Sequence, residues 1–445
     1  MGTMKHHLVL KLRTALIETV RIPDWQTFIT DKSALVTSLG PTIDAVLHSI
    51  HREFWVTHEY AMAADGWSVS ERLHGLDRTY RIIMDSLERI PDETLERLSS
   101  NPDIEQVHQL FVASSPMPRH DYAAPMASTS TAAASIGTDF AHALTLGRPD
   151  ITIAVLDTGV SLQHPELVGV VHKTADFVDL AGLDTTPFIG DVLEADDDPA
   201  DELGHGTHVA GIIAAQGLQM EPGMAPRCRL LAGRVLATMQ TEAGPQGAGI
   251  VDNINPAVKW AVDSGANIIN MSVGIRHTGG GLPHADVIAY ALGKGVTVVA
   301  ASGNDGTQTK YYPGALPGVI AVGACDDEGS IASFNSFGAR ISVVAPGVRI
   351  LSSYVDRRYA VASGTSQAAP HVAGAVALLL SLAADNGFTL GPSEIMGILR
   401  ATSDRVDTHD RNPHAGYGRI NLSDAFKWLL HTSPRTRARS LSIPQ

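Results

Sequence analysis

The chain has 445 residues, of which 44% are hydrophobic and 18% are charged, so it is long enough for two domains and too apolar for a disordered protein. The formal net charge is −14, and an acidic balance of this size argues against a nucleic-acid partner because phosphates would be repelled. The two cysteines, Cys228 and Cys325, allow one disulfide and exclude a disulfide framework.

The first zone of the chain, residues 1–113, is charged and mixed in character. Helix-like periodicity lies around Ala34–His51 and Asp92–Ser99, and strand-like runs lie at Leu8–Leu12 and Ile104–Val112. The start of the chain lacks the apolar stretch and the small-residue cleavage site of a secretory signal. We therefore expect a cytoplasmic protein, with secretion by another route as the alternative.

An exposed linker is predicted over residues 114–135, where Ser, Pro, Thr and Ala predominate without any apolar period. From residue 136 to residue 430, continuous apolar strands alternate with helices. The predicted strands are Ile151–Leu156, Arg229–Leu236, Asn267–Met271 and Val296–Ala300, and the predicted helices include Gly204–Gln216, Asn253–Ser264 and His284–Lys294. This alternation predicts a three-layer α/β fold with a mostly parallel sheet covered on both faces.

The end of the chain is polar, and the most apolar helix candidate is short. Residues 431–445 carry three arginines and two prolines, and we expect a flexible tail there. The most apolar helix candidate, Val372–Ala384, is shorter than the about 20 residues that a bilayer requires. We therefore expect no membrane partner.

Two motifs supply a candidate acid and a candidate base. Asp157 begins an Asp-Thr-Gly turn just past a buried strand, where the chemistry of an open α/β sheet is found. Such a turn also occurs in aspartic proteases, which need two carboxylates, and one such motif is present here. His205 starts a predicted helix between two glycines that let another backbone come close. A metal pair of His205 and His208 is the alternative, but the Glu of a zinc-protease helix is absent.

Two further motifs supply a candidate nucleophile and an amide donor. Ser366 opens the most apolar helix after three small residues, which leave room for a substrate carbonyl. A serine at a helix start is usually an N-cap, yet its N–H at the positive helix end can also face an oxyanion. Asn304 lies in a Gly-rich loop after a strand, where Asn is normally a turn former. Its side-chain amide is also a neutral donor suited to a tetrahedral oxyanion.

Taken in the order Asp, His, Asn, Ser, these motifs resemble the subtilisin family of serine proteases, and the resemblance covers about residues 140–428. It extends beyond the four candidate residues to stretches that are long and specific: Gly204–Gly211, Gly223–Pro226, Asn270–Gly274, Tyr312-Pro313, Val319–Gly323, Ala345–Gly347, Ser363–Gly374 and Gly416–Asn421. The resemblance implies a serine endopeptidase in which Asp157 orients His205, His205 is the general base, and Ser366 attacks the carbonyl. The side chain of Asn304 and the N–H of Ser366 would hold the oxyanion.

The resemblance also implies where a protein or peptide substrate would bind. The substrate would lie as an extended strand between Gly247-Ala248-Gly249 on one side and Ser272-Val273-Gly274 on the other. Tyr311 falls where the family usually places glycine at the floor of the main specificity pocket, so we expect a shallow pocket.

No cofactor or metal is required on this interpretation, although calcium is possible. The stretch Ala214–Pro222 is short and nearly free of oxygen ligands, so the calcium loop common in the family is expected to be lost. The acid run of Asp196, Asp197, Asp198, Asp201 and Glu202 is the second candidate. A solvated acidic loop is the simpler interpretation of it.

Within residues 1–113, the stretch Ile90–Val107 resembles the last helix and strand of the family's inhibitory prodomain. The resemblance implies a small α/β N-terminal domain that is an intramolecular partner of the protease, with Gln109–Ser115 in the substrate groove. The alternatives are an unrelated interaction domain and a module that senses a partner and controls the protease.

Two rival functions were weighed against the endopeptidase. An α/β-hydrolase esterase would order its triad Ser, acid, His and use Gly-x-Ser-x-Gly, whereas Ser366 comes last here and Ala368 holds the final position. A peptide-binding pseudoprotease would usually lack a member of the triad, and all three candidates are present.

Overall fold

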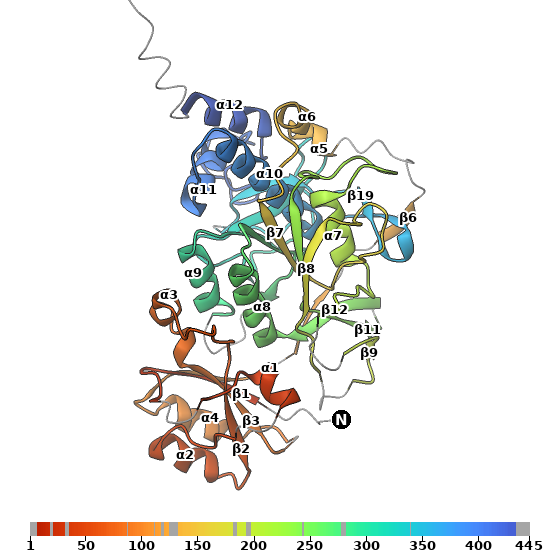
Figure 1. Ribbon diagram of the computed structural model, residues 1–445. Helices are drawn as coiled ribbons and strands as arrows, with labels where there is room; N and C mark the ends of the chain where they lie inside the picture. The colour runs from red at the N-terminus through yellow and green to blue at the C-terminus, as the bar shows by residue number, and fades with distance from the viewer. Residues whose placement is uncertain are drawn as a thin grey trace, which may run out of the picture.

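The structure is a computed structural model that describes residues 7–17, 21–31, 35–86, 88–110, 112–116, 120–123, 132–180, 185–192, 197–242, 244–276, 282–338 and 340–432. We call residues 7–110 the N-terminal unit and residues 132–432 the C-terminal unit. Figure 1 shows the N-terminal unit, in red and orange, beside the helices α8 and α9 of the C-terminal unit. Of the predicted tail 431–445, residues 433–445 lie outside the described residues.

A seven-stranded parallel sheet is the centre of the C-terminal unit. Its order is β18 (Val343–Pro346), β17 (Ile320–Cys325), β15 (Thr297–Ala301), β13 (Ile268–Met271), β7 (Thr152–Asp157), β10 (Arg229–Arg234) and β8 (Val171–Asp176). Each neighbouring pair runs parallel. Parallel sheets need crossover helices on their faces, and the alternation predicted from the sequence supplies them.

The helices cover both faces of this sheet (Figure 1). Along β7, Ile153 and Val155 pack with α7 (His205–Ala214) and α10 (Thr365–Asp385). The alternate residues Ala154 and Leu156 pack with α8 (Val251–Asp263) and α9 (Ala285–Gly293). Because successive side chains of a strand point to opposite faces, one strand contributes to two cores. The predicted three-layer α/β fold is confirmed.

The helix α10 is longer than the predicted Val372–Ala384. By length and composition it is the one helix of the described residues that could cross a membrane, but most of it is buried among the sheet, α7 and α12. Cys228 and Cys325 are both buried and free.

Shorter elements frame this core. The helices are α5 (Ala132–Ser135), α6 (Thr138–His142), α11 (Pro392–Thr402) and α12 (Leu422–Thr432), and the strands are β9 (Phe188–Ile189), β11 (Ala237–Thr241), β12 (Gly244–Ile250), β14 (Ile275–Arg276), β16 (Tyr311–Tyr312), β19 (Ile350–Ser353) and β20 (Tyr359–Ala362).

The N-terminal unit is a four-stranded antiparallel sheet in the order β2 (Phe54–His58), β3 (Thr79–Met84), β1 (His7–Leu12) and β4 (Ile104–Gln109). Its helices are α1 (Trp25–Thr30), α2 (Pro41–His48), α3 (Val69–Leu73) and α4 (Asp92–Ser99). The predicted helix over Ala34–His51 was too long, because the helix begins at Pro41, whose fixed φ suits a first turn.

Of the predicted linker over residues 114–135, residues 117–119 and 124–131 lie outside the described residues. The described remainder contains regular structure. Ser114, Ser115 and Pro116 belong to the strand β5 (Val112–Pro116), which pairs antiparallel with β12. The strand β6 (His120–Ala123) pairs antiparallel with β20. The hydrogen bonds of these strands are made with strands at the edges of the C-terminal unit. The segment itself has no alternation of apolar residues, so its sequence did not predict strands.

Candidate active site

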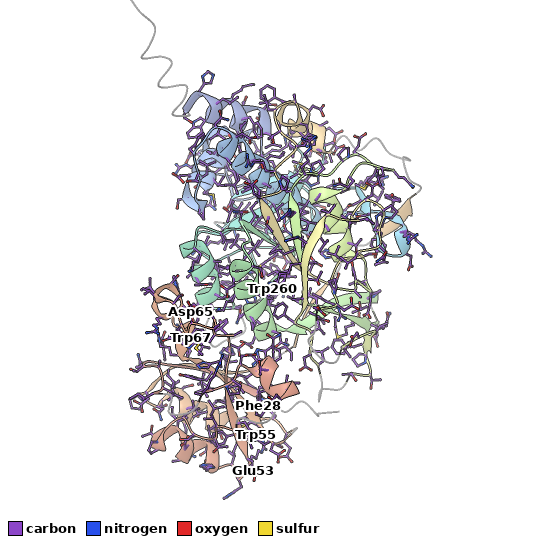
Figure 2. The ribbon with its side chains drawn as sticks, in the orientation of Figure 1. Phe28, Glu53, Trp55, Asp65, Trp67 and Trp260 are labelled. Atoms are coloured by element: carbon purple, nitrogen blue, oxygen red, sulfur yellow. The ribbon has the colours of Figure 1, made fainter. Side chains whose placement is uncertain are left out.

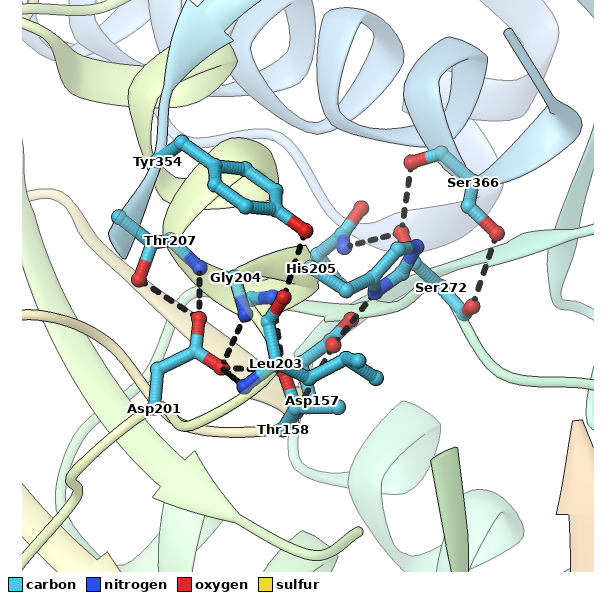
Figure 3. Close-up of polar contacts among 12 residues, drawn as sticks. Asp157, Thr158, Asp201, Leu203, Gly204, His205, Thr207, Ser272, Tyr354 and Ser366 are labelled. Carbon is cyan, nitrogen blue, oxygen red and sulfur yellow. Dashed lines mark hydrogen bonds and ion pairs between the residues drawn. The ribbon is translucent and has the colours of Figure 1, made fainter. Parts of the chain in front are cut away.

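Asp157 and His205 form a buried pair at the carboxyl edge of the central sheet (Figure 3). Asp157 is the last residue of β7, and His205 is the first residue of α7. The His205 Nδ1 atom lies 2.6 Å from Asp157 Oδ1, and the two residues are 5% and 0% exposed. The other ring nitrogen, His205 Nε2, makes no hydrogen bond within the described residues. The ring is therefore held through one nitrogen while the other stays available.

The glycine after His205 allows the close approach that the sequence indicated. A Cβ at Gly206 would lie 2.0 Å from the carbonyl oxygen of Gly159, on the turn that follows Asp157. No larger residue fits this gap, so the glycine brings the helix start against the Asp157 turn.

Asp201 orders the loop that leads into His205, a role that the sequence analysis missed. Its carboxylate accepts hydrogen bonds from the backbone N–H groups of Leu203, Gly204 and Thr207 and from the hydroxyls of Thr158 and Thr207, at 2.6–3.0 Å. An aspartate shortly before a helix start is a capping signal, and that signal was present in the sequence. The description of this acid run as a solvated loop is wrong for Asp201.

The surroundings of His205 shift its protonation. Burial acts to lower the pKa of His205, but the charge and hydrogen bond of Asp157, with a further contribution from Asp201, outweigh burial and raise the pKa above 6.5. The imidazolium form is thus stabilised by the two carboxylates. A base of this kind accepts a proton more readily than an isolated imidazole.

Ser366 lies in the first turn of α10, where backbone N–H groups have no partner within the helix. It exchanges two hydrogen bonds with Ser272: the Ser366 hydroxyl donates to the Ser272 carbonyl at 3.1 Å, and the Ser272 hydroxyl donates to the Ser366 carbonyl at 3.0 Å. Asn270 Nδ2 in turn donates to the Ser272 hydroxyl at 3.0 Å. Figure 3 draws the His205 ring between Asp157 and the pair of serines.

Asn304 is exposed and lies near the start of the loop that follows β15. Its Oδ1 atom accepts hydrogen bonds from the N–H of Thr365 at 2.8 Å and from the Thr365 hydroxyl at 2.9 Å. Because the carbonyl end of the amide is held in this way, its NH₂ group is the end left to donate elsewhere. Thr365 directly precedes Ser366, so the amide and the serine are fixed to each other.

One of the two predicted substrate edges is paired with a strand of the same chain. Gly247, Ala248 and Gly249 belong to β12 and pair antiparallel with Ser115, Ser114 and Ala113 of β5. The strand β5 also contacts β14, which follows Ser272-Val273-Gly274. A segment in the position of an extended peptide therefore lies along the predicted groove.

The Tyr311 ring lies against two glycines of this groove. A Cβ at Gly274 would lie 3.1 Å from a ring atom of Tyr311, and one at Gly303 would lie 2.3 Å from another. Gly274 belongs to a predicted substrate edge, and Gly303 precedes Asn304. The structure thus brings Tyr311 to the predicted pocket.

The residues of the acid run do not fit a bound cation. The Asp201 carboxylate is occupied by the donors described above, and Glu202 accepts a hydrogen bond from the N–H of Asp191 and lies 3.4 Å from Arg234. Asp197 and Asp198 are exposed, and Asp196 lies outside the described residues. Within the part of the chain that the structure describes, no cluster of three His, Cys, Asp or Glu side chains could hold a metal.

Comparisons with known proteins show which family this chain resembles. Residues 148–418 match the model of the subtilase family. A thermophilic serine proteinase of Bacillus sp. (strain AK1) is 41% identical over 65% of this chain and 65% of its own length, so the chain spans less than two thirds of that relative. Thermitase of Thermoactinomyces vulgaris is 36% identical over 62% of this chain and 88% of its own length. A solved structure, the prenylagaramide maturation protease PagA, is 31% identical with a TM-score of 0.54 and matches 66% of this chain and 98% of that protein.

Proposed function

Because the chain belongs to the subtilase family of serine proteases, we propose that it hydrolyses peptide bonds with Asp157, His205 and Ser366 as its catalytic triad. The observation that carries this proposal is the buried Asp157–His205 hydrogen bond of 2.6 Å, which leaves His205 Nε2 without a partner. An oriented base with a free nitrogen beside a serine at a helix start is the arrangement that activates a hydroxyl.

In the proposed mechanism, the Ser366 hydroxyl exchanges its bond to the Ser272 carbonyl for one to His205 Nε2. His205 removes the proton as Ser366 attacks the substrate carbonyl, and the buried Asp157 stabilises the imidazolium that forms. The NH₂ group of Asn304 and the N–H of Ser366 donate to the oxyanion. His205 then protonates the leaving amine, and water releases the acyl group by the same steps in reverse order.

The direct test is peptide hydrolysis by the wild type and by Ser366→Ala. We expect Ser366→Ala to abolish hydrolysis while its thermal unfolding stays close to that of the wild type. Full hydrolysis by folded Ser366→Ala would reject the assignment.

We further propose that residues 1–113 form a prodomain-like domain that restrains the protease. The pairing of β5 with Gly247–Gly249 supports this, because an occupied edge is closed to substrate. The boundary between the units supports it as well. The N-terminal residues Tyr60 and Leu76 share a core with α8 and α9, and Trp67 packs against the same core at the boundary (Figure 2).

The boundary is also rich in buried charge. Arg81 is 0% exposed, binds both oxygens of Glu59 at 2.7 and 2.8 Å, and donates to Asn253 Oδ1 of α8 at 3.0 Å. Lys259 of α8 pairs with Glu71 at 2.7 Å. Each of these buried charges has a partner, so docking leaves none of them buried and unpaired.

Limited self-cleavage within residues 114–135 would release the restraint. Cleavage in cis is favoured because a tethered segment has a high effective concentration. We expect the wild type to lose an N-terminal fragment and gain activity, while Ser366→Ala stays full length by mass spectrometry. A wild type that is fully active and stays intact would support a partner-sensing module instead.

The substrates that we propose are proteins or peptides, bound as an extended strand in the groove now held by β5. The solved structure described above is named as a maturation protease, and by analogy a processed peptide is one substrate class for this chain. We propose a cytoplasmic location, with secretion by another route as the alternative.

A further inference from the structure

Tyr311 borders both the substrate groove and a cavity. Its ring lies against Gly274 and Gly303, which border the substrate groove. Tyr311 also lines a cavity of about 520 Å³, together with Ser302, Ser336 and Phe337. Pockets that hold whole ligands measure about 300–1,000 Å³, so this space is large enough for any side chain. The position of one ring therefore decides how deep the pocket beside the groove is.

Arg276 and Asp305 hold this ring by its hydroxyl. The Tyr311 hydroxyl donates to Asp305 Oδ2 at 3.1 Å and accepts from Arg276 Nε at 3.2 Å. Arg276 and Asp305 close the triangle with an ion pair of 2.9 Å. The guanidinium carbon of Arg276 also lies 5.6 Å from the centre of the Tyr311 ring, within the range of a cation–π contact.

The backbone pairing also holds Arg276 and Tyr311 next to each other. Arg276 and Tyr311 lie directly opposite each other in the antiparallel pairing of β14 with β16. Cross-strand neighbours in this arrangement are within reach of each other's side chains. The contact is therefore part of the strand register and does not depend on the reach of a long flexible side chain alone.

The two partners of Tyr311 differ in how firmly they are held. Asp305 accepts further hydrogen bonds from the Ser336 hydroxyl at 2.6 Å and from the N–H of Thr307 at 3.1 Å. Burial acts to raise the pKa of Asp305, but these donors and Tyr311 outweigh it and lower the pKa, so the carboxylate stays ionised. The Arg276 side chain is 61% exposed and the Asp305 side chain 21%. Arg276 can therefore be removed without opening the core.

We propose that Arg276 is a specificity-positioning residue, which holds the Tyr311 ring across the mouth of the cavity and so limits the protease to small side chains before the cut. The inference rests on the proposed function. With Arg276 present, the hydroxyl has two charged partners and the ring stays against Gly274 and Gly303. Without it, the ring keeps one partner and moves more freely, and the cavity becomes open to a large side chain.

The test compares two peptides that differ only in Ala or Phe before the cut, and the ratio of their kcat/KM values is measured. This ratio does not depend on the fraction of active enzyme. We expect Arg276→Ala to raise the Phe-to-Ala ratio about tenfold, and Tyr311→Gly to raise it about a hundredfold, in the range that pocket changes of this size produce. Tyr311→Phe keeps the ring, loses the hydroxyl and should resemble Arg276→Ala.

Arg400→Ala is the matched control. Arg400 is 55% exposed, pairs with Asp410 at 2.8 Å and lies 5.2 Å from the Tyr417 ring centre, so it makes the same kinds of contact elsewhere. Its removal should leave the ratio within about twofold. Arg276→Lys keeps a charged donor at the same strand position, so its Phe-to-Ala ratio should lie between those of the wild type and Arg276→Ala.

Two results would overturn this inference, and a third would overturn the proposed function. If Tyr311→Gly raises the ratio and Arg276→Ala does not, Tyr311 keeps its place unaided and the proposal is wrong. If Arg276→Ala instead loses cleavage after Glu, with the Phe-to-Ala ratio unchanged, Arg276 contacts substrate directly and the proposal is also wrong. If hydrolysis persists in Ser366→Ala, the proposed function itself fails, whatever the ratio.

Discussion

Two of the aspartate–histidine pairs among the described residues differ in which ring nitrogen is bound. In the first pair, Asp157 holds Nδ1 of His205 at 2.6 Å and leaves Nε2 without a partner. In the second, Asp252 of α8 holds Nε2 of His108 from β4 at 2.8 Å and leaves Nδ1 without a partner. The first pair lies within the C-terminal unit, and the second joins the two units.

The comparison shows that the residue types of an Asp–His pair do not decide its role. The groups around the second ring nitrogen decide it. Both histidines have a raised pKa, because in each case the carboxylate outweighs the opposing effect of burial. Figure 3 draws the His205 ring near Ser366, which lies in the first turn of α10. His108 lies on the last strand of the N-terminal unit, and its partner lies in the first turn of α8, directly after the substrate edge β12. The same pair is thus suited to catalysis in one place and to docking in the other.

The largest effect is expected from breaking the first pair. His205→Ala should abolish hydrolysis, and Asp157→Asn should lower kcat by about 10⁴-fold because the imidazole loses its orientation and charge support. Peptide hydrolysis measures the loss, and circular dichroism confirms folding. Asp252→Asn is the matched control, since it removes the same charge from the second pair and should leave kcat unchanged after the N-terminal unit is released. An equal loss of kcat in both variants would contradict the distinction between the pairs.

A smaller loss is expected at the oxyanion donor. Asn304→Ala removes the NH₂ group and should lower kcat by about 10²–10³-fold with little change in KM, since this bond strengthens in the transition state. Steady-state kinetics on one peptide test this. A change confined to KM would show that Asn304 helps to bind the substrate and does not stabilise the transition state specifically.

The pH profile sharpens the comparison further. His205 must be neutral to accept the serine proton, and its pKa is raised, so activity should fall as pH decreases through a midpoint above 6.5. In Asp157→Asn the residual activity should have its midpoint at lower pH, because the main cause of the raised pKa is gone. An acidic limb that does not move in Asp157→Asn would argue against this pair as the source of the shift.

The smallest effect is expected at the second pair. Because the pKa of His108 is raised in the docked unit, its contribution is complete below 6.5 and is lost as pH rises through the raised value. The pKa of Asp252 is lowered, so the pair also weakens when pH falls below 3.8. His108→Ala should therefore speed release of the N-terminal unit several-fold at pH 6 and less at pH 9. Timed mass spectrometry of the cleaved fragment measures this, and an equal effect at both pH values would contradict it.

The sequence predicted most of the C-terminal unit because its signals are local. Continuous apolar runs marked the parallel strands, and the motifs around Asp157, His205 and Ser366 stand at strand and helix ends that the structure brings together. The family resemblance is confirmed by the comparisons. The catalytic roles of the individual residues stay predictions until they are measured.

The features that the sequence analysis missed depend on contacts between distant segments. The strands β5 and β6 form because the strands β12 and β20 supply hydrogen-bond partners. No alternation of apolar residues in β5 or β6 is needed for this pairing, and the sequence shows none. The role of Asp201 depends on donors from Thr158 and Thr207, which surround it only in the folded chain. The Arg276–Tyr311 contact follows from a strand pairing of two residues on each side.

The most direct test of the central claim is treatment with a fluorophosphonate, which labels an activated serine, followed by mass spectrometry. The wild type and His205→Ala are compared after an added protease has cut both chains between the two units. We predict a single label on Ser366 in the wild type and none in His205→Ala, because the hydroxyl needs its base. Labelling of Ser366 that is equally fast in the wild type and in His205→Ala would contradict the account, since Ser366 would then react without the Asp157–His205 pair.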